Sequence, residues 1–176
     1  MKLAAQGRYD EALALIKREN PLPAICGRVC NRRCEDACTR GRVDAAVAID
    51  EVKRFIAQQD LDAETRFIPE KVIPKVDGEF TERIAIIGGG PTGIAAAYFC
   101  GRAGIETTIF ERESCLGGVP RHVIPGFRIA NEAIEKDIAL MEQYGVEVKC
   151  GAPAPSVDEL KKMGYTHILL AVGAWK

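Results

Sequence analysis

The sequence has few histidines, no excess of positive charge and no long uninterrupted apolar run. It has only two histidines, His122 and His167, and we find no acid–base triad in it. Its formal net charge is −1, which gives no reason to expect a nucleic acid as a partner. Residues 1–10 hold no apolar stretch of the signal-peptide type, and the longest apolar run, 84–101, is interrupted by a glycine–proline turn at 88–91. We therefore expect a cytoplasmic protein without a membrane span.

Two regions of different pattern divide the 176 residues, a length that suffices for one domain or two small ones. Hydrophobic residues make up 47% and charged residues 28%, the composition of an ordinary globular protein. The first region has helical patterning, whereas strand and helix patterns alternate in the second, as in a parallel α/β sheet. We predict a helical domain over 1–72, a linker over 73–82 and an α/β domain over 83–176.

The helical region is expected to contain two amphipathic helices. Asp10 is placed to cap the first, which extends through Lys17. Asp44 is placed to cap the second, which extends through Gln59. The residues expected on the buried face of the second helix are Val52, Phe55 and Ile56.

The α/β region is expected to contain a helix over 131–144 and short strands over 146–149 and 167–172. Ser156 and Glu159 have the spacing of a capping box, which predicts the start of another helix. The strand over 167–172 is almost continuously apolar, so we expect it to be buried.

The most informative motif is a glycine-rich turn between a hydrophobic strand and a helix of small residues. The spacing GxGxxG is weak by itself, but here a second strand that ends in an acid follows. In such a motif the first glycine permits the turn, the second lets a pyrophosphate approach the backbone, and the third lets the helix pack on the strand. These glycines are Gly88, Gly90 and Gly93, and Glu111, 23 positions after the first, has the reach for a ribose hydroxyl. The pattern predicts a dinucleotide whose pyrophosphate lies on the helix N-terminus.

Four of the seven cysteines fall within thirteen residues, with the spacing C-x3-C-x3-C-x3-C. They are Cys26, Cys30, Cys34 and Cys38. Residues four apart lie on nearly one side of a helix, so part of this segment can present several thiolates together. Clustered thiols without a secretion signal indicate a metal or redox centre more than disulfides. The spacing disfavours zinc and suits an iron–sulfur cluster, whose negative charge the intervening arginines would offset. Zinc and a purely structural role for the cysteines stay open at this point.

The cysteine run, the glycine motif and further segments together resemble a known family. The segments are Leu22 to Cys30, Gly117-Gly118, Ile124-Pro125-Gly126-Phe127-Arg128 and Leu170-Ala171-Val172-Gly173-Ala174. Over residues 5–176 the sequence resembles the glutamate synthase small (beta) subunit and the corresponding part of dihydropyrimidine dehydrogenase.

The resemblance implies an α-helical, ferredoxin-like iron–sulfur domain followed by a Rossmann-type FAD-binding domain with a mainly parallel sheet. It implies an oxidoreductase in which electrons pass between NAD(P)H, FAD and two [4Fe-4S] clusters, and on to a partner subunit or domain. The implied FAD contacts are Gly88, Gly89, Gly90, Pro91, Thr92, Gly93, Glu111, Gly118, Val119, Arg128 and Ala154. The implied cluster ligands are Cys30, Cys34 and Cys38, divided between two clusters, whereas Cys26 matches a cysteine that is not a ligand.

The sequence departs from the family pattern at the cluster ligands and at both ends. A further ligand that is Gln or Glu in the family is matched by Lys53, and an ammonium has no lone pair to donate. An upstream cysteine motif with most of the other ligands, and a following NAD(P)H domain, are not found in this sequence. The resemblance therefore implies an internal piece of a larger protein.

Other functions are compatible with parts of the pattern. A flavin thiol–disulfide reductase shares the fold, but it needs a pair of redox cysteines, and Cys115 stands alone beside Gly117-Gly118. A non-catalytic docking or scaffold module with empty cofactor sites is a second alternative. NAD is an alternative cofactor, but Gly117-Gly118 and Arg128 favour FAD. His122 follows Arg121 in the flavin loop; we expect it to be a surface residue, with a position beside the cofactor as the alternative.

Overall fold

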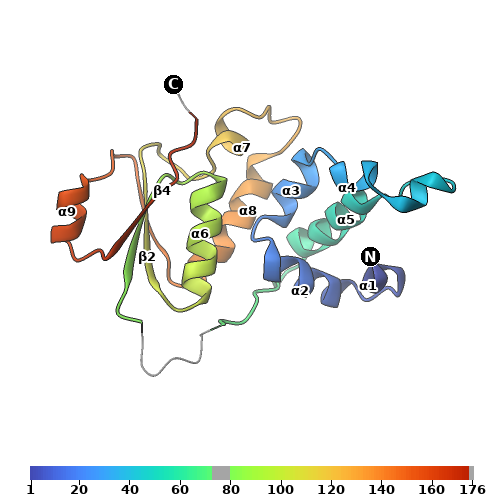
Figure 1. Cartoon of the computed structure of the whole chain (residues 1–176), viewed down its shortest axis with the longest axis horizontal. Helices are drawn as coiled ribbons and strands as arrows, with labels where there is room; N and C mark the ends of the chain where they lie inside the picture. Colours follow the sequence, from blue (N-terminus) through green and yellow to red (C-terminus); the bar gives the residue numbers. More distant parts are fainter. Residues whose placement is uncertain (73–79, 175–176) are drawn as a thin grey trace.

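The computed structural model describes residues 1–72 and 80–174 of the chain. A helical part, formed by α1 to α5, lies beside an α/β part that contains the sheet and helices α6 to α9 (Figure 1). The helices of the first part are α1 (Lys2–Ala5), α2 (Tyr9–Glu19), α3 (Pro23–Val29), α4 (Arg33–Asp36), the 3₁₀ helix η1 (Thr39–Arg42) and α5 (Ile49–Asp62). No helix in the described part of the chain is long and apolar enough to cross a membrane.

The first predicted cap is wrong. Helix α2 begins at Tyr9 with Arg8 at its N-cap, so that Asp10 lies inside the first turn. An acid in this position still faces the positive end of the helix dipole. On the apolar side of this helix, Leu13 is buried and Ile16 is half-buried.

The second predicted cap is also wrong, because Asp44 is engaged in a local turn. Its carboxylate pairs with Arg40 and accepts the backbone N–H of Ala45, and α5 begins only at Ile49. Of the residues expected on its buried face, Ile56 is 3% exposed and Val52 is half-buried. Phe55 is 45% exposed, which contradicts the prediction: its ring packs edge-on against Tyr9 at the surface instead.

The sheet of the second part has four parallel strands in the order β3-β2-β1-β4. They are β1 (Arg83–Ile87), β2 (Glu106–Glu111), β3 (Glu147–Cys150) and β4 (His167–Leu170). The helices are α6 (Pro91–Arg102), α7 (Val119–His122), α8 (Asn131–Glu142) and α9 (Val157–Lys162). The predicted α/β pattern with a parallel sheet is confirmed.

Helices cover the two faces of the sheet unequally. Figure 1 shows α6 and α8 on the face toward the helical part and α9 on the opposite side. Successive residues of β1 serve the two faces: Ile86 packs in the cluster with α6 and α8, whereas Ala85 packs with Leu160 of α9. Leu22 and Ile25 of the helical part join the same cluster as Ile86. The two parts therefore share one hydrophobic core, and the predicted boundary at 73–82 lies mostly outside the described residues.

Local signals in the second half are confirmed, but one burial prediction is wrong. Ser156 Oγ accepts the N–H of Glu159 at 3.3 Å while the Glu159 carboxylate accepts the N–H of Ser156 at 2.8 Å, which completes the capping box of α9. Strand β4 was expected to be buried, yet Leu169 is 38% and Leu170 is 67% exposed. Among the described strands β4 pairs only with β1, so that it forms an edge of the sheet.

Candidate functional site

A cavity of about 590 Å³ opens at the carboxyl ends of β1, β2 and β4. In a parallel α/β sheet this end is where ligands bind. The N-terminal turn of α6 and the segments that follow β2 and β3 complete its walls. The lining residues used below are Gly88, Gly90, Pro91, Thr92, Glu111, Glu113, Gly118, Val119, His122, Pro153, Ala154, Pro155 and Ala171.

The three motif glycines meet the steric demands that the sequence predicts. Gly88 has φ +109°, and a Cβ there would lie 2.4 Å from the carbonyl oxygen of Ala171. A Cβ on Gly93 would lie 1.9 Å from the carbonyl oxygen of Gly88, so only glycine lets α6 pack this closely. At Gly90 the nearest heavy atom is the Cα of Gly118, 3.8 Å from an added Cβ. The backbone at Gly90 therefore has open space in front of it, as the approach of a pyrophosphate requires.

Glu111 ends β2 at the wall of the cavity, and backbone groups hold its carboxylate in place. Its Oε2 accepts the N–H of Gly89 at 2.6 Å and its Oε1 accepts the N–H of Glu113 at 2.9 Å. The side chain is thus tied to the glycine turn on one side and to the segment after β2 on the other. Each carboxylate oxygen keeps acceptor capacity for a further donor, such as a ribose hydroxyl.

The structure brings most of the predicted FAD contacts together and separates three from them. Eight line the cavity: Gly88, Gly90, Pro91, Thr92, Glu111, Gly118, Val119 and Ala154. Gly89 and Gly93 lie behind the wall, where they support the turn. Arg128 is exposed and is not among the lining residues. A cofactor role for any of these residues remains a prediction.

Other lining residues were not singled out from the sequence as binding residues. His122 was expected to be a surface residue; it is exposed, and it also borders the cavity. Pro153 and Pro155 flank Ala154, and the alternation of alanine and proline over 152–155 is the only signal that marks them. Two fixed φ values make this segment a stiff rim.

The cysteine segment is not one helix, which corrects the expectation of a shared helical face. Helix α3 ends before Cys30, whose backbone is extended, and Arg32 has φ +58°. Cys34 then lies in the four-residue helix α4, and Cys38 is again extended ahead of η1. Within the described residues no group of three histidine, cysteine or acidic side chains is placed to hold a metal ion.

Backbone N–H groups donate to the sulfurs of two predicted ligands. Cys30 Sγ accepts the N–H of Arg32 at 3.4 Å. Hydrogen bonds from the backbone of Val47, Arg40 and Gly41 lower the pKa of Cys38. Donors of this kind favour a thiolate, the form of cysteine that binds iron. The Cys26 thiol differs: burial raises its pKa.

Lys53 lies beside these thiols as a cation and not as a ligand. Its ammonium is 2.8 Å from Oδ1 of Asp50, a carboxylate with a side chain only 3% exposed. Burial opposes the charge, but the hydrogen bond and ion pair with Asp50 outweigh burial and raise the pKa of Lys53, as do Cys30 and Cys26. Cys30 and Cys38 each have surroundings that suit an iron-bound thiolate, but the described side chains do not make a complete cluster site.

A redox disulfide finds no support in the described residues. All seven cysteines, Cys115 included, are free.

Comparison with family models agrees with the two parts of the fold. Residues 1–65 match the family described as dihydropyrimidine dehydrogenase domain II, 4Fe-4S cluster. Residues 86–148 match the family described as NAD(P)-binding Rossmann-like domain.

Curated relatives match the chain over nearly its whole length. YgfK of Escherichia coli (strain K12), whose name proposes an oxidoreductase, is 38% identical over 177 residues, which cover 100% of this chain and 17% of YgfK. The glutamate synthase [NADPH] small chain of Bacillus subtilis (strain 168) is 33% identical over 99% of this chain and 35% of its own length. The NAD-dependent dihydropyrimidine dehydrogenase subunit PreT of Salmonella typhimurium is 32% identical over 94% of this chain and 40% of its own length.

This chain therefore spans well under half the length of these relatives. Among solved structures, histamine dehydrogenase from Rhizobium sp. 4-9 aligns with 61% of this chain and 16% of its own, at 24% identity and a TM-score of 0.48.

Proposed function

We infer the function from the membership of this chain in the oxidoreductase family that joins a dihydropyrimidine dehydrogenase-type 4Fe-4S domain to a Rossmann-like dinucleotide domain. We propose that it is the FAD- and iron–sulfur-containing portion of an NAD(P)H-linked electron-transfer oxidoreductase of the cytoplasm. Its electrons pass to a partner subunit or domain. The observation that carries this proposal is the cavity at the carboxyl ends of the parallel strands, bordered by the glycine turn and Glu111.

The residues of the cavity suit the adenosine pyrophosphate of a dinucleotide. The open backbone at Gly90 and the N-terminal turn of α6 receive the pyrophosphate, where the helix dipole favours an anion. The carboxylate of Glu111, already oriented by two backbone N–H groups, accepts hydrogen bonds from the ribose. When bound, FAD accepts a hydride and releases electrons singly.

The extent of the cavity favours FAD over NAD. A simple dinucleotide fingerprint involves the first strand, the glycine turn, the first helix and the acid after the second strand. This cavity also includes Gly118 and Val119, which precede and begin α7, and Ala154, which follows β3. Gly118 has φ +53°, and a Cβ there would lie 2.7 Å from the Cα of Gly90, so this segment needs glycine to approach the turn.

The cysteine segment is proposed to supply part of the ligands of two clusters. Cys30, Cys34 and Cys38 give the thiolates, and the remaining ligands come from other parts of the longer protein. Lys53, whose pKa is raised, stays protonated and contributes positive charge rather than a bond to iron. Positive charge beside a thiolate-bound cluster stabilises its reduced, more anionic form.

Absorbance and titration with nucleotides test the proposal. The longer protein that carries this chain, purified under nitrogen, should show flavin bands at about 370 and 450 nm and a broad iron–sulfur shoulder at about 400 nm. After bound flavin has been removed from the protein, added FAD should bind at this site more tightly than NADH or NADPH. A colourless, folded protein that takes up no FAD would leave the docking-module alternative.

Adding a single methyl group at Gly90 tests the cavity without disturbing the rest of the fold. In Gly90→Ala the Cβ meets nothing closer than 3.8 Å, so the fold is retained while the methyl occupies the approach of the pyrophosphate. We expect FAD affinity to fall at least about tenfold, since one lost phosphate hydrogen bond to a charged group is worth about 1.5 kcal/mol. Gly41→Ala is the matched control, because its Cβ also makes only ordinary contacts, at 3.7 Å or more. Equal FAD affinity in both variants would argue against this site.

A further inference from the structure

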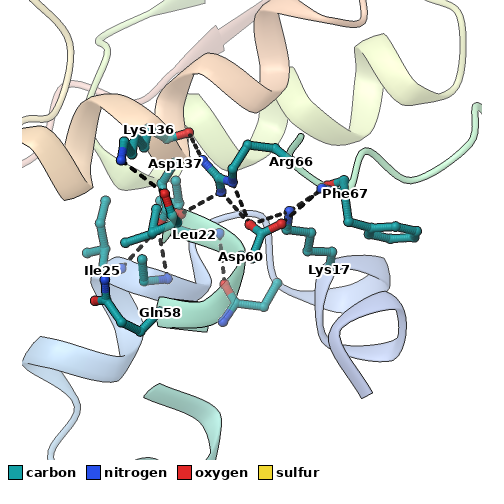
Figure 2. A network of polar contacts seen from close by, with 12 residues as sticks. Lys17, Leu22, Ile25, Gln58, Asp60, Arg66, Phe67, Lys136 and Asp137 are labelled. Carbon is teal, nitrogen blue, oxygen red and sulfur yellow. Dashed lines mark hydrogen bonds and ion pairs between the residues drawn. The ribbon is translucent and has the colours of Figure 1, made fainter. Parts of the chain in front are cut away.

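A carboxylate of the α/β part is buried against the helix that leads to the cysteines. Asp137 belongs to α8 and is 1% exposed. Its Oδ2 accepts the backbone N–H groups of Ala24 and Ile25, both at 3.0 Å. These two donors belong to the first turn of α3, whose N–H groups have no partner within the helix. Asp137 therefore caps α3 from another part of the fold, as Figure 2 shows.

Half-buried Arg66 and buried Asp60 extend this contact into a chain of charged side chains (Figure 2). Arg66 lies 3.8 Å from Oδ1 of Asp137 and donates to the carbonyl oxygen of Lys136 at 3.0 Å. Its Nε also donates to Asp60 at 2.6 Å, and Asp60 accepts from the fully buried Lys17 at 2.7 Å. The segments α2, α5, 66–67 and α8 are thus held in one arrangement around the N-terminus of α3.

Burial makes this cap unusual for a carboxylate. It raises the pKa of Asp137 to about 6, while the N–H groups of Ile25 and Ala24 and the charges of Arg66 and Lys17 act in the opposite direction. Oδ1 has no hydrogen bond within the described residues. Burying a carboxylate costs free energy unless its hydrogen-bond partners stay in place. The position of Asp137 therefore determines the positions of Ala24 and Ile25.

The helix that Asp137 caps is short and ends at a predicted cluster ligand. Helix α3 has seven residues, and Cys30 follows as its C-cap, with its N–H bonded to the carbonyl oxygen of Cys26 at 3.1 Å. A shift or fraying of the first turn of so short a helix reaches its last residue, because only two turns separate them.

We propose that Asp137 is a positioning residue: the dinucleotide-binding part, through this carboxylate, fixes α3 and with it the Cys30 thiolate relative to the flavin cavity. The placement of α3 stands on the contacts above, whereas the consequence for a cluster rests on the function proposed for this chain. Asp137 touches neither the cavity nor a cysteine, and it acts through the helix.

Three variants separate the hydrogen-bond acceptor from the charge. Asp137→Leu keeps the volume and removes the acceptor, whereas Asp137→Asn keeps an acceptor oxygen for Ala24 and Ile25. Glu142→Gln, on the exposed side of the same helix, is the control. In the chain itself we measure amide hydrogen exchange over 23–30 and the rate at which iodoacetamide alkylates Cys30.

We expect Asp137→Leu to accelerate both rates at least tenfold, with exchange in β1 and α6 unchanged, and Asp137→Asn to stay within threefold of the unmodified protein. Equal rates in the Leu and Asn variants would overturn the proposal. If the Leu variant does not fold, the unmodified chain decides: Ala24 and Ile25 should be among the slowest amides of the helical part, and exchange as fast as in exposed loops would overturn the proposal too.

The protein with its clusters bound provides a measurement that a merely structural role of Asp137 would not change. In the longer protein with its clusters, Asp137→Leu should shift the electron paramagnetic resonance signal of the cluster that Cys30 binds, at unchanged FAD content, and Asp137→Asn should restore it. An unchanged signal with accelerated exchange would refute the link to the cluster. Absence of FAD and iron from the unmodified protein would instead refute the proposed function, and the exchange and alkylation results would still decide the role of Asp137.

Discussion

Removal of the Lys17 charge is the sharpest test of how the helical part is held. Its ammonium is fully buried, 2.7 Å from Asp60 Oδ2 and 2.5 Å from the carbonyl oxygen of Phe67. Lys17→Met keeps most of the stem and removes both interactions. Breaking a buried ion pair costs about 3–5 kcal/mol. Because Arg66 still neutralises Asp60, we expect the lower end, a loss of about 3 kcal/mol in the free energy of unfolding.

A double-mutant cycle makes this expectation quantitative. Asp60→Leu leaves two cations without their carboxylate, so it should cost about 5 kcal/mol. The double variant should cost less than the sum by about 2 kcal/mol, since each single change already breaks the shared pair. Urea unfolding followed by far-ultraviolet circular dichroism measures all three, and Lys161→Met, an exposed site on α9, should change stability by less than about 0.5 kcal/mol. A loss below about 1 kcal/mol for Lys17→Met, or strict additivity in the cycle, would refute the reasoning.

Three further predictions concern other parts of the fold. Asp137 has a pKa of about 6 in the folded protein and an ordinary value of 3.8, so the folded state binds its proton more tightly. Its contribution to the free energy of unfolding should therefore fall by about 3 kcal/mol as pH rises from about 4 to 6. Urea unfolding at several pH values should show that Asp137→Asn lacks this slope, although Arg66, Lys17 and Asp60 still face the site. Gly93→Ala places a methyl group 1.9 Å from a carbonyl oxygen, so it should lower the free energy of unfolding in urea by at least about 2 kcal/mol and also lower the affinity for FAD. An unaltered urea midpoint would show that α6 moves away freely. Ser156→Ala removes the cap of α9 and should lower the free energy of unfolding by about 1 kcal/mol in urea unfolding, whereas Ser114→Ala, at an exposed site, should change it by less than about 0.5 kcal/mol.

Interactions between near neighbours in sequence were predictable, because their physics needs no knowledge of the fold. The capping box of Ser156 and the close packing of Gly93 on Gly88 depend on a few adjacent residues, and the structure confirms them. Asp44 shows the limit of such reasoning. It has the chemistry of a helix cap, but Arg40, one turn earlier, offers it a competing partner.

Burial and long-range polar contacts were harder to predict, since they depend on what lies across the fold. The apolar sequence of β4 indicates a buried strand, yet its place at the sheet edge leaves Leu170 exposed. Asp137 interrupts the apolar face formed by Ile134, Ile138 and Met141, and this interruption was the available signal for a buried contact. Its partner, the N-terminus of α3, lies 113 residues earlier at Ala24; Pro23 marks the start of that helix but not the residue that caps it.

The parallel pairing of β1 with β4 sets the order in which the cavity can be completed during synthesis. Ile84 pairs with His167, and Ala171 then hydrogen-bonds to Ile87 and packs against Gly88. Contacts between segments so distant in sequence form late, because the intervening chain must first be ordered. A nascent chain that has not yet released Ala171 from the ribosome has the glycine turn but not the wall behind it. Completion of the cavity is therefore a late event in the folding of this chain, after the first βαβ unit has formed.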